Sequence, residues 1–521
     1  ETYKRIQVTA IALFCLLSTN DALRILGVFP LFSKSHSILG HGIVNHLLEG
    51  GHEVVHITSF PSNKVLPNLK EVDVSNIGKQ FMDENISKSM ELKNQVAQGN
   101  MADSVFLLYI THVMHKQLLL DPQFVNLLSD PKEQFDVVIT EWFFSEIFTG
   151  LAPLFQCPLI WFDSTELHWQ VLRVIDEIPN PAYTVEIFAT SRPPLNFWQR
   201  AAELFKIINR SVILNLFDIF FFYPPIAAKR GVEMPPFEEA AYNASLMFVN
   251  SHPSFGSPFK LPANVINIAG FHINDKLQPL PKELQKLLDE AKHGVIYFSM
   301  GSNLKSKDMS EDMKQTFLDI FKKLKETVVW KFEGQLDNLP ANVHLIKWAP
   351  QQSILAHPNL KLFITHGGQL STTEAVHYGK PIVGLPVMAD QTLNMIAVQS
   401  KGFGIKVTIT EDRKMEQELY AAIQEILTDE KYKLRAKELS MIYHDRIASP
   451  GQELLHWVQH VVNTRGALHL RSPALHVPLY QKLYLDLAAL IIVVVMVIKF
   501  IVKKIINTKN NIMGNKKEKS H

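Results

Sequence analysis

The chain has 521 residues and carries 52 lysines and arginines against 51 aspartates and glutamates, which leaves a formal net charge of +1. This balance excludes the strongly positive surface that a nucleic-acid partner needs. Two cysteines, Cys15 and Cys157, cannot supply a disulfide framework, and the length predicts two sizeable domains that rely on their cores.

Residues 1–22 are predicted to be a signal peptide. Lys4 and Arg5 precede the apolar run 8–17, and small or polar residues follow that run. A buried helix is the alternative interpretation, but the run lacks amphipathic spacing. We therefore expect the chain to enter the secretory pathway.

Short apolar or β-branched runs alternate with helical stretches along most of the chain. The predicted strands are Arg24–Phe29, Val54–Ser59, Asp136–Thr140, Leu159–Phe162, Leu246–Asn250, Val265–Ala269, Val295–Ser299, Thr327–Phe332, His344–Lys347, Leu362–Thr365 and Pro381–Leu385. Such runs favour parallel sheets buried on both faces, so the predicted fold class is α/β. A polar, proline-containing stretch, 271–285, is the predicted linker between halves 23–270 and 286–444.

The segment 363–375 predicts an anion-binding turn. A buried strand leads into the pair Gly367–Gly368 and then into a helix that opens near Ser371. The free N–H groups and the positive end of a helix dipole attract a phosphate, and glycines allow the backbone to approach it closely. His366 adds a donor, and Glu374 can accept from sugar hydroxyls. Alone, the pattern is weak, because many turns of this kind carry glycines for steric reasons.

Two further elements extend this pattern: Trp348-Ala-Pro-Gln351 upstream and Asp390-Gln391 downstream. The whole run resembles the signature of the UDP-glycosyltransferases, the superfamily that includes the animal UDP-glucuronosyltransferases, and it is most similar to the insect members. The resemblance implies a GT-B fold, in which two Rossmann-like domains face a cleft. The domain 23–270 would bind the acceptor, and the domain 286–444 would bind a UDP-sugar.

The resemblance also assigns donor contacts. The uracil base and the ribose would be met by Trp348, Gln351 and Glu374. The diphosphate would be met by Ser302, His366, Gly368 and Ser371. The sugar hydroxyls would be met by Asp390 and Gln391. The sequence contains no Asp-x-Asp, the motif with which many sugar transferases hold a cation, so we expect the leaving group to be stabilised without a metal.

His36 is the predicted general base. It follows the strand 24–29 at the start of a helix, so it should lie at the carboxyl edge of the first sheet, where α/β proteins bind ligands. A neutral imidazole can take a hydroxyl proton near physiological pH, and Ser35-His36 resembles the family's Ser-His element. His41 and His46, farther along the helix, are interpreted as exposed or structural.

Glu141 is the predicted catalytic partner of His36. A histidine base usually needs an orienting carboxylate. In vertebrate relatives an Asp closes the strand Phe-Asp-Val-Val-x-x-Asp, whereas here Glu141 closes the corresponding run from Phe135. Asp136 is the weaker candidate, because it should lie at the opposite sheet edge. The implied reaction is an inverting displacement in which the acceptor oxygen attacks the anomeric carbon.

The C-terminal part predicts a membrane anchor. Residues 445–482 resemble the family's segment that crosses back over the first domain, although Gly451 and Gln452 are unusual there. The run 483–502 is long enough for one transmembrane helix, and the basic tail 503–521 should then be cytosolic.

The end of the tail is similar to the dilysine signals of the endoplasmic reticulum. Three glycosylation sequons agree with a lumenal body: Asn85, Asn209 and Asn243. The expected protein is therefore a single-pass type I glycoprotein of that membrane.

The expected donor is UDP-glucose, which insect members typically use, and no permanently bound cofactor is expected. The aromatic first half predicts a small lipophilic acceptor such as a phenol, a steroid or a plant toxin, and hence a role in detoxification. The segment 176–223 could line the acceptor cleft or touch the bilayer. A catalytically inactive, membrane-anchored binding protein of the same fold and a processive synthase are the alternatives, and a homo- or hetero-oligomer is left open.

Overall fold

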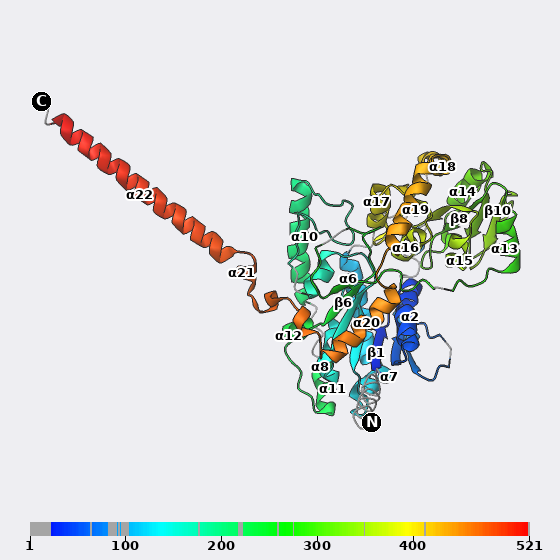
Figure 1. Cartoon of the computed structure of the whole chain (residues 1–521), viewed down its shortest axis with the longest axis horizontal. Helices are drawn as coiled ribbons and strands as arrows, with labels where there is room; N and C mark the ends of the chain where they lie inside the picture. Colours follow the sequence, from blue (N-terminus) through cyan, green and yellow to red (C-terminus); the bar gives the residue numbers. More distant parts are fainter. Residues whose placement is uncertain are drawn as a thin grey trace, which may run out of the picture. The chain divides into compact units, whose positions relative to one another are not determined.

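The computed structural model describes residues 22–62, 65–81, 91, 94, 104–175, 178–216, 222–257, 260–274, 276–348, 350–410 and 413–518. The chain divides into two compact units, residues 1–470 and residues 471–521. The first unit holds two β-sheets with helices packed against them (Figure 1). The predicted signal peptide lies outside the described residues, except for Ala22.

The first sheet has seven parallel strands in the order β3-β2-β1-β4-β5-β6-β7. Their bounds are β1 (Arg24–Phe29), β2 (Glu53–Thr58), β3 (Leu69–Asp73), β4 (Val137–Trp142), β5 (Leu159–Asp163), β6 (Leu246–Val249) and β7 (Val265–Asn267). The second sheet has six parallel strands in the order β10-β9-β8-β11-β12-β13. Their bounds are β8 (Val295–Ser299), β9 (Thr327–Lys331), β10 (Val343–Ile346), β11 (Leu360–Thr365), β12 (Ile382–Gly384) and β13 (Gly404–Lys406). The predicted α/β class is thus confirmed.

The helices of the first unit follow the strands in chain order. Those before β8 are α2 (Lys34–Glu49), α3 (Ser75–Phe81), α6 (Ser104–Leu120), α7 (Pro122–Ser129), α8 (Leu151–Phe155), α9 (Trp169–Val174), α10 (Phe197–Leu216), α11 (Tyr223–Arg230), α12 (Phe237–Ala241) and α13 (Lys282–Asp289). Those after it are α14 (Glu311–Lys322), α15 (Gln351–Ala356), α16 (Gln369–His377), α17 (Gln391–Ser400), α18 (Arg413–Thr428), α19 (Glu430–His444) and α20 (Pro450–Asn463). Short 3-10 helices span Ile147–Gly150, Ser306–Asp308 and Leu468–Leu470.

The central parts of most strands are apolar because both faces of each sheet are covered. Successive residues of β1 show this: Ile25 belongs to a core that includes Ile43 of α2 and Leu454 of α20, whereas Leu26 belongs to a core on the other side with Leu128 of α7. A strand with polar residues on alternate positions could not fill both cores.

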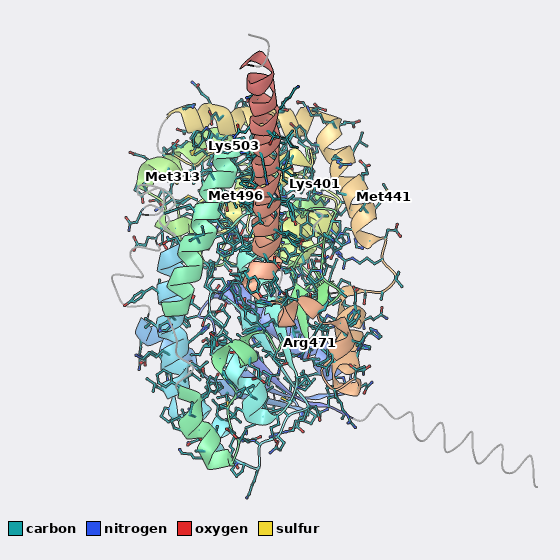
Figure 2. The ribbon with its side chains drawn as sticks, turned by 90° about the vertical axis from the view of Figure 1, so that its left-hand side faces the viewer. Met313, Lys401, Met441, Arg471, Met496 and Lys503 are labelled. Atoms are coloured by element: carbon teal, nitrogen blue, oxygen red, sulfur yellow. The ribbon has the colours of Figure 1, made fainter. Side chains whose placement is uncertain are left out.

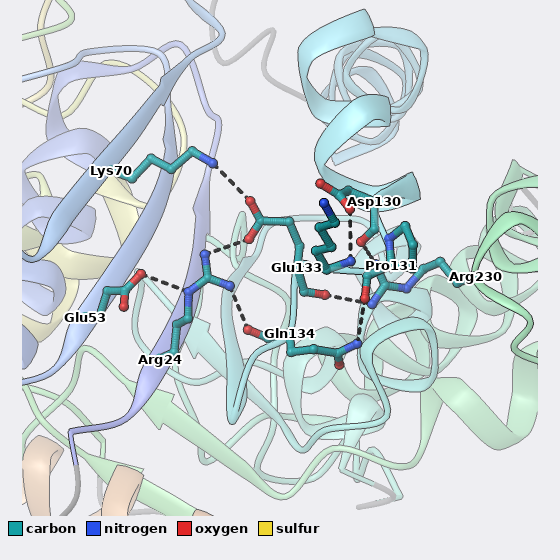
Figure 3. Close-up of polar contacts among 9 residues, drawn as sticks. Arg24, Glu53, Lys70, Asp130, Pro131, Glu133, Gln134 and Arg230 are labelled. Atoms are coloured by element: carbon teal, nitrogen blue, oxygen red, sulfur yellow. Dashed lines mark hydrogen bonds and ion pairs between the residues drawn. The ribbon is translucent and has the colours of Figure 1, made fainter.

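A network of charged side chains joins the amino ends of three strands in the first sheet. Arg24 on β1 donates to Glu53 on β2 at 2.8 Å and to Glu133 at 2.6 Å (Figure 3). Lys70 on β3 donates to the Glu133 carboxylate at 3.0 Å, and Arg230 of α11 donates to the backbone carbonyl of Glu133 at 2.7 Å. The network therefore fixes the strands at the edge opposite to their carboxyl ends.

Two strands were not expected from the sequence. β3 carries Lys70 and Glu71 and lies at the sheet edge, where exposed positions tolerate charge. β13 has three residues, too few for a periodic pattern. The other strands start or end within two residues of their predicted bounds, and α16 begins at Gln369, two residues before the predicted opening.

The helix α20 contacts α2 in the first sheet's half. Gly451 explains part of this contact, because a Cβ at this position would collide with the ring of His46. Gln452 completes a capping box with Ser449, accepting from the Ser449 N–H at 3.0 Å. The two residues that are unusual for this segment thus have local structural roles.

The predicted domain boundaries stay a prediction.

The second unit contains a 3-10 helix (Pro473–His476), α21 (Leu479–Lys482) and α22 (Leu485–Glu518). Tyr484, with a φ of 56°, separates α21 from α22. Within α22, the stretch Leu485–Asn510 is long and apolar enough to cross a membrane, by length and composition. Figure 2 shows Met496 and Lys503 along this helix.

Candidate active site

A cavity of about 370 Å³ in the first unit is lined by residues that follow strands of both sheets. The structure brings the predicted site residues together there, although they come from widely separated segments. Those that line the cavity are His36, Ser302, Trp348, Gln351, His366, Gly368, Ser371, Glu374, Asp390 and Gln391. Its size falls within the range of small-molecule sites.

His36 lies in the first turn of α2, and Glu141 lies near the carboxyl end of β4. The strands β1 and β4 are neighbours, so both side chains reach the same edge of the sheet. His36 Nδ1 and Glu141 Oε1 are 2.5 Å apart, and the Glu141 side chain is buried. An ionised carboxylate can only accept, so Nδ1 carries a proton, and Nε2 has a lone pair whenever the ring is neutral. The imidazole is therefore oriented to accept a proton.

The surroundings of His36 favour its protonated form. Burial lowers the pKa of His36, but the charge of Glu141 and its hydrogen bond outweigh burial, so the pKa is raised above 6.5. Asp163, on the neighbouring strand β5, behaves differently. Burial raises the pKa of Asp163 well above its ordinary value, which favours the neutral carboxyl beside the charged Glu141. Asp136 lies at the opposite end of β4 and accepts from the backbone N–H of Arg24 at 2.7 Å, as expected.

The turn before α16 has the glycines that an anion site needs. Gly367 has a φ of 80°, which favours glycine, and Gly368 immediately precedes the helix. A Cβ at Gly368 would lie 2.6 Å from His366 Nε2, and one at Gly301 would lie 2.5 Å from His366 Cε1. Both glycines therefore leave room for the His366 ring beside the helix N-terminus.

Lys331 is a cavity residue that the sequence analysis missed. It ends β9, its side chain is 9% exposed, and its ammonium donates to the Gly301 carbonyl at 2.8 Å and to Glu333 at 2.6 Å. Burial, with the charge of Lys331, lowers the pKa of His366 to about 4, so His366 is a neutral hydrogen-bond donor. A lysine that closes the buried run Thr327–Lys331 was the available signal.

Glu374 lies on α16 and is held by two glutamines. Gln351 Nε2 donates to one carboxylate oxygen at 2.7 Å, and Gln352 Nε2 donates to the other at 3.1 Å. Gln351 also donates to Ser371 Oγ at 3.3 Å. The carboxylate is therefore fixed in the cavity wall, with its oxygens available to hydroxyl donors that replace the glutamine contacts.

The remaining donor-side residues differ in exposure. The Trp348 ring is 57% exposed and lies 4.4 Å from the ammonium of Lys34. Asp390 accepts from Asn394 Nδ2 at 2.7 Å. Gln391 accepts from the N–H groups of Val387 and Met388 at 2.9 and 3.0 Å, so its carbonyl holds the loop and its amide nitrogen is left to donate.

The first half adds an apolar wall beside His36. Phe143 packs edge-on against the His36 ring at a centroid distance of 4.8 Å, and Phe144, Ile187 and Phe188 continue the lining. Part of the aromatic segment 176–223 therefore reaches the cavity. Another part does not: Trp198 and Phe205 on α10 are 78% and 69% exposed.

Hydrogen bonds beside the cavity also join the half of the chain that holds the first sheet to the half that holds the second sheet. Asn303, after β8, donates to Ser33 Oγ at 3.0 Å and to Ser35 Oγ at 3.3 Å, next to His36. Gln369 Nε2, at the start of α16, donates to the Asn250 carbonyl at 2.7 Å. Neither contact was predicted, because each joins residues that no local motif connects.

Two of the three predicted glycosylation sites, Asn209 and Asn243, do not line this cavity. Asn209 on α10 and Asn243 before β6 are exposed, as a glycosylation site requires. Asn85 lies outside the described residues.

Comparison with known proteins gives consistent relatives. A family model described as UDP-glucoronosyl and UDP-glucosyl transferase matches residues 26–520. UDP-glucosyltransferase 2 of Dactylopius coccus is 33% identical over 504 residues, which cover 95% of each chain. An ecdysteroid UDP-glucosyltransferase of Spodoptera littoralis nuclear polyhedrosis virus is 28% identical over 494 residues, 90% of this chain and 94% of the relative. Human UDP-glucuronosyltransferase 2B7 is 26% identical over 488 residues, 89% of each chain.

Solved structures match in fold. A UDP-glucosyltransferase from Polygonum tinctorium matches with a TM-score of 0.56 and 14% identity, over 86% of this chain and 100% of the solved chain. Arabidopsis thaliana UGT89C1, complexed with UDP-L-rhamnose, matches with a TM-score of 0.55 and 14% identity, over 85% and 100%. These matches confirm the predicted GT-B fold.

Proposed function

The chain belongs to the UDP-glucoronosyl and UDP-glucosyl transferase family and is a UDP-glycosyltransferase, and on that premise we propose that it transfers glucose from UDP-glucose to a hydroxyl of a small lipophilic acceptor. The resemblance found in the sequence is confirmed. The observation that carries the proposal is the hydrogen bond between the buried Glu141 and His36, which lines the same cavity as the residues proposed to bind the donor.

His36 is the general base of the proposed reaction. Its Nε2 takes the acceptor's hydroxyl proton while the acceptor oxygen forms a bond to the anomeric carbon. The bond between that carbon and the diphosphate breaks, and its electron pair leaves with UDP. Attack opposite to the leaving group inverts the configuration. Glu141 acts through His36, because its charge stabilises the imidazolium that forms.

The leaving group is stabilised mainly by Lys331 and the N-terminus of α16. Lys331, which is ion-paired with Glu333, brings its ammonium to the cavity wall, while His366, with a pKa of about 4, supplies a neutral donor. The free N–H groups of α16 and the hydroxyls of Ser302 and Ser371 complete the proposed set. In this proposal the protein's own groups stabilise the diphosphate without a metal. Glu374 would accept from the ribose, and Trp348 would lie against the uracil.

The proposed donor sugar and acceptor rest on separate observations. UDP-glucose is favoured because relatives at 33% and 28% identity are named UDP-glucosyltransferases. A lipophilic acceptor is favoured by the apolar wall of Phe143, Phe144 and Phe188 beside His36. Asp390 and Gln391 are proposed to contact the sugar hydroxyls.

The proposed location is the endoplasmic reticulum membrane. The stretch Leu485–Asn510 supports a single membrane anchor, and the exposed Asn209 and Asn243 support a lumenal body. Glycosidase treatment of the protein from microsomes should lower its apparent mass. An unchanged mass in cells that glycosylate other lumenal proteins would contradict this topology.

The reaction is tested by UDP release from the full chain in detergent, with a panel of UDP-sugars and small phenols, steroids and plant toxins. We expect acceptor-dependent release that is fastest with UDP-glucose, together with a β-linked product from the α-linked donor. Binding of UDP without release, with every acceptor and sugar, would favour the inactive binding protein instead.

A further inference from the structure

Two histidines and one glutamate meet between α2 and the edge of the first sheet, and we propose that they form a binding site for a zinc-type divalent metal ion. His41 lies on α2, His56 on β2 and Glu71 on β3, and one ligand atom from each lies within 4.8 Å of the others. His56 and Glu71 are paired in register, so their side chains share one face of the sheet. These residues do not line the substrate cavity.

His56 is the strongest single indication. Its side chain is 1% exposed, yet neither ring nitrogen has a hydrogen-bond partner in the described part of the chain. Its Nδ1 lies 3.5 Å from Glu71 Oε1, beyond the range of a good hydrogen bond. A bound ion would satisfy a polar group that is otherwise costly to bury.

The other two side chains are already oriented by contacts on their far atoms. His41 Nε2 lies 2.8 Å from the Phe60 carbonyl, so it donates there and leaves Nδ1 with a free lone pair. Glu71 Oε2 accepts from the Ser62 N–H and from Ser62 Oγ, both at 2.9 Å, and the same N–H makes a longer contact of 3.2 Å with Oε1, the oxygen nearer His56. Metal-binding histidines and carboxylates are typically held in this way by outer contacts, which fix the tautomer and the direction of the lone pair.

The chemistry of the set favours zinc over harder cations. Two imidazoles and a carboxylate are common zinc ligands, whereas Mg²⁺ and Ca²⁺ prefer oxygen atoms. Tetrahedral zinc with bonds of about 2.1 Å needs donor atoms about 3.4 Å apart. Small side-chain rotations would bring the present spacing to that value, and water would occupy the fourth position. The ion would then tie α2, the helix that begins next to His36, to β2 and β3.

Cobalt binding tests the proposal without depending on transferase activity. The full chain, purified in detergent without a polyhistidine tag and stripped with EDTA, is titrated with Co²⁺ and then with Zn²⁺. We expect one Co²⁺ per chain, visible absorption of a tetrahedral complex, and loss of that absorption when Zn²⁺ is added. Zinc should also raise the melting temperature of the stripped protein.

Matched variants decide which residues hold the ion. His56→Leu removes an unpartnered imidazole but fills the core, and Glu71→Gln keeps an oxygen for Ser62; each should weaken Co²⁺ binding by at least about tenfold. His46→Gln, on the same helix, and His460→Gln, at the surface pair with His469, should bind Co²⁺ as the unaltered chain does.

Some results would overturn the site. Absence of Co²⁺ absorption in the unaltered chain would do so, as would binding that survives in both His56→Leu and Glu71→Gln. Loss of binding in His460→Gln instead would show an adventitious surface site. UDP binding by each variant reports that it is folded, so a failed fold cannot be mistaken for a lost ligand.

Discussion

The two sides of the cavity are encoded differently in the chain. The proposed donor side is concentrated in the second half, where residues from Trp348 to Gln391 follow one another along α15, the turn before α16, α16 itself and the start of α17. The acceptor side is scattered: His36 and Glu141 are separated by 105 positions, and Phe188 comes from a third segment. A compact motif can be recognised in a single sequence. Residues that are distant in the sequence can be recognised as one site only when the fold that brings them together is known.

The electrostatics of the two sides differ as well. On the acceptor side a buried carboxylate raises the pKa of His36, so that histidine can carry charge. On the donor side Lys331 and burial lower the pKa of His366 to about 4. The pKa values of two histidines in one cavity are thus shifted in opposite directions. These shifts fit a base that receives a proton and a hydrogen-bond donor that stays neutral beside a phosphate.

Removal of the base should have the largest effect. His36→Ala should lower kcat by about two to four orders of magnitude, because no positioned base then takes the hydroxyl proton of the acceptor substrate. UDP affinity should stay nearly the same, since the proposed nucleotide contacts lie in the second half. The measurements are turnover and UDP titration, with His46→Ala on the same helix as the control. Turnover close to that of the unaltered chain would remove His36 from the mechanism.

Lys331→Met tests the charge on the donor side. Loss of a charged hydrogen bond of about 1.5 to 3 kcal/mol should weaken UDP binding by roughly tenfold to a hundredfold. Lys331→Arg should restore part of it. Lys323→Met, which removes an exposed lysine paired with Glu416, should leave UDP binding unchanged. Equal UDP affinities of Lys331→Met and Lys323→Met would show that Lys331 only makes structural contacts with Gly301 and Glu333.

The fold class, most strands and the family signature could be predicted from the sequence, because long apolar runs and a continuous signature are local properties. It missed β3 and β13, an edge strand with charged residues and a strand of three residues. Lys331 was missed because a lysine at a strand end has many structural uses. Asn303 and its bonds to Ser33 and Ser35 depend on how the halves meet, which no local pattern records.

Glu141→Gln should have a smaller effect on turnover and a clear effect on its pH dependence. A neutral hydrogen bond replaces a charge-assisted one, a difference of about 1 kcal/mol that lowers kcat several-fold to about tenfold. His36 must be neutral to accept a proton, so activity falls as pH drops through its raised pKa, above 6.5. Without the Glu141 charge, burial lowers the pKa of His36 and only the charge of Asp390 opposes burial, so the pKa falls.

The acidic limb of the pH profile should therefore move to lower pH in Glu141→Gln, even though the maximal rate is lower. A profile of kcat/KM against pH for both proteins measures this shift. A limb that stays in place, or moves to higher pH, would show that Glu141 does not set the charge state of His36.

The smallest effects concern how far a bound UDP-sugar protects and stabilises the chain when the two halves close over it. A UDP-sugar that closes the halves over the cavity should protect the segment 271–284 from proteolysis and stabilise the fold by about 2.7 kcal/mol at a hundredfold excess over the dissociation constant. Glu374→Ala should reduce both effects, because this carboxylate, now held by Gln351 and Gln352, is proposed to bind the ribose. His36→Ala should keep both, because His36 meets the acceptor. Limited proteolysis and thermal melts at matched UDP-sugar concentrations measure them. Equal losses in both variants would show that the first half also holds the donor, and the division between an acceptor side and a donor side would then be wrong.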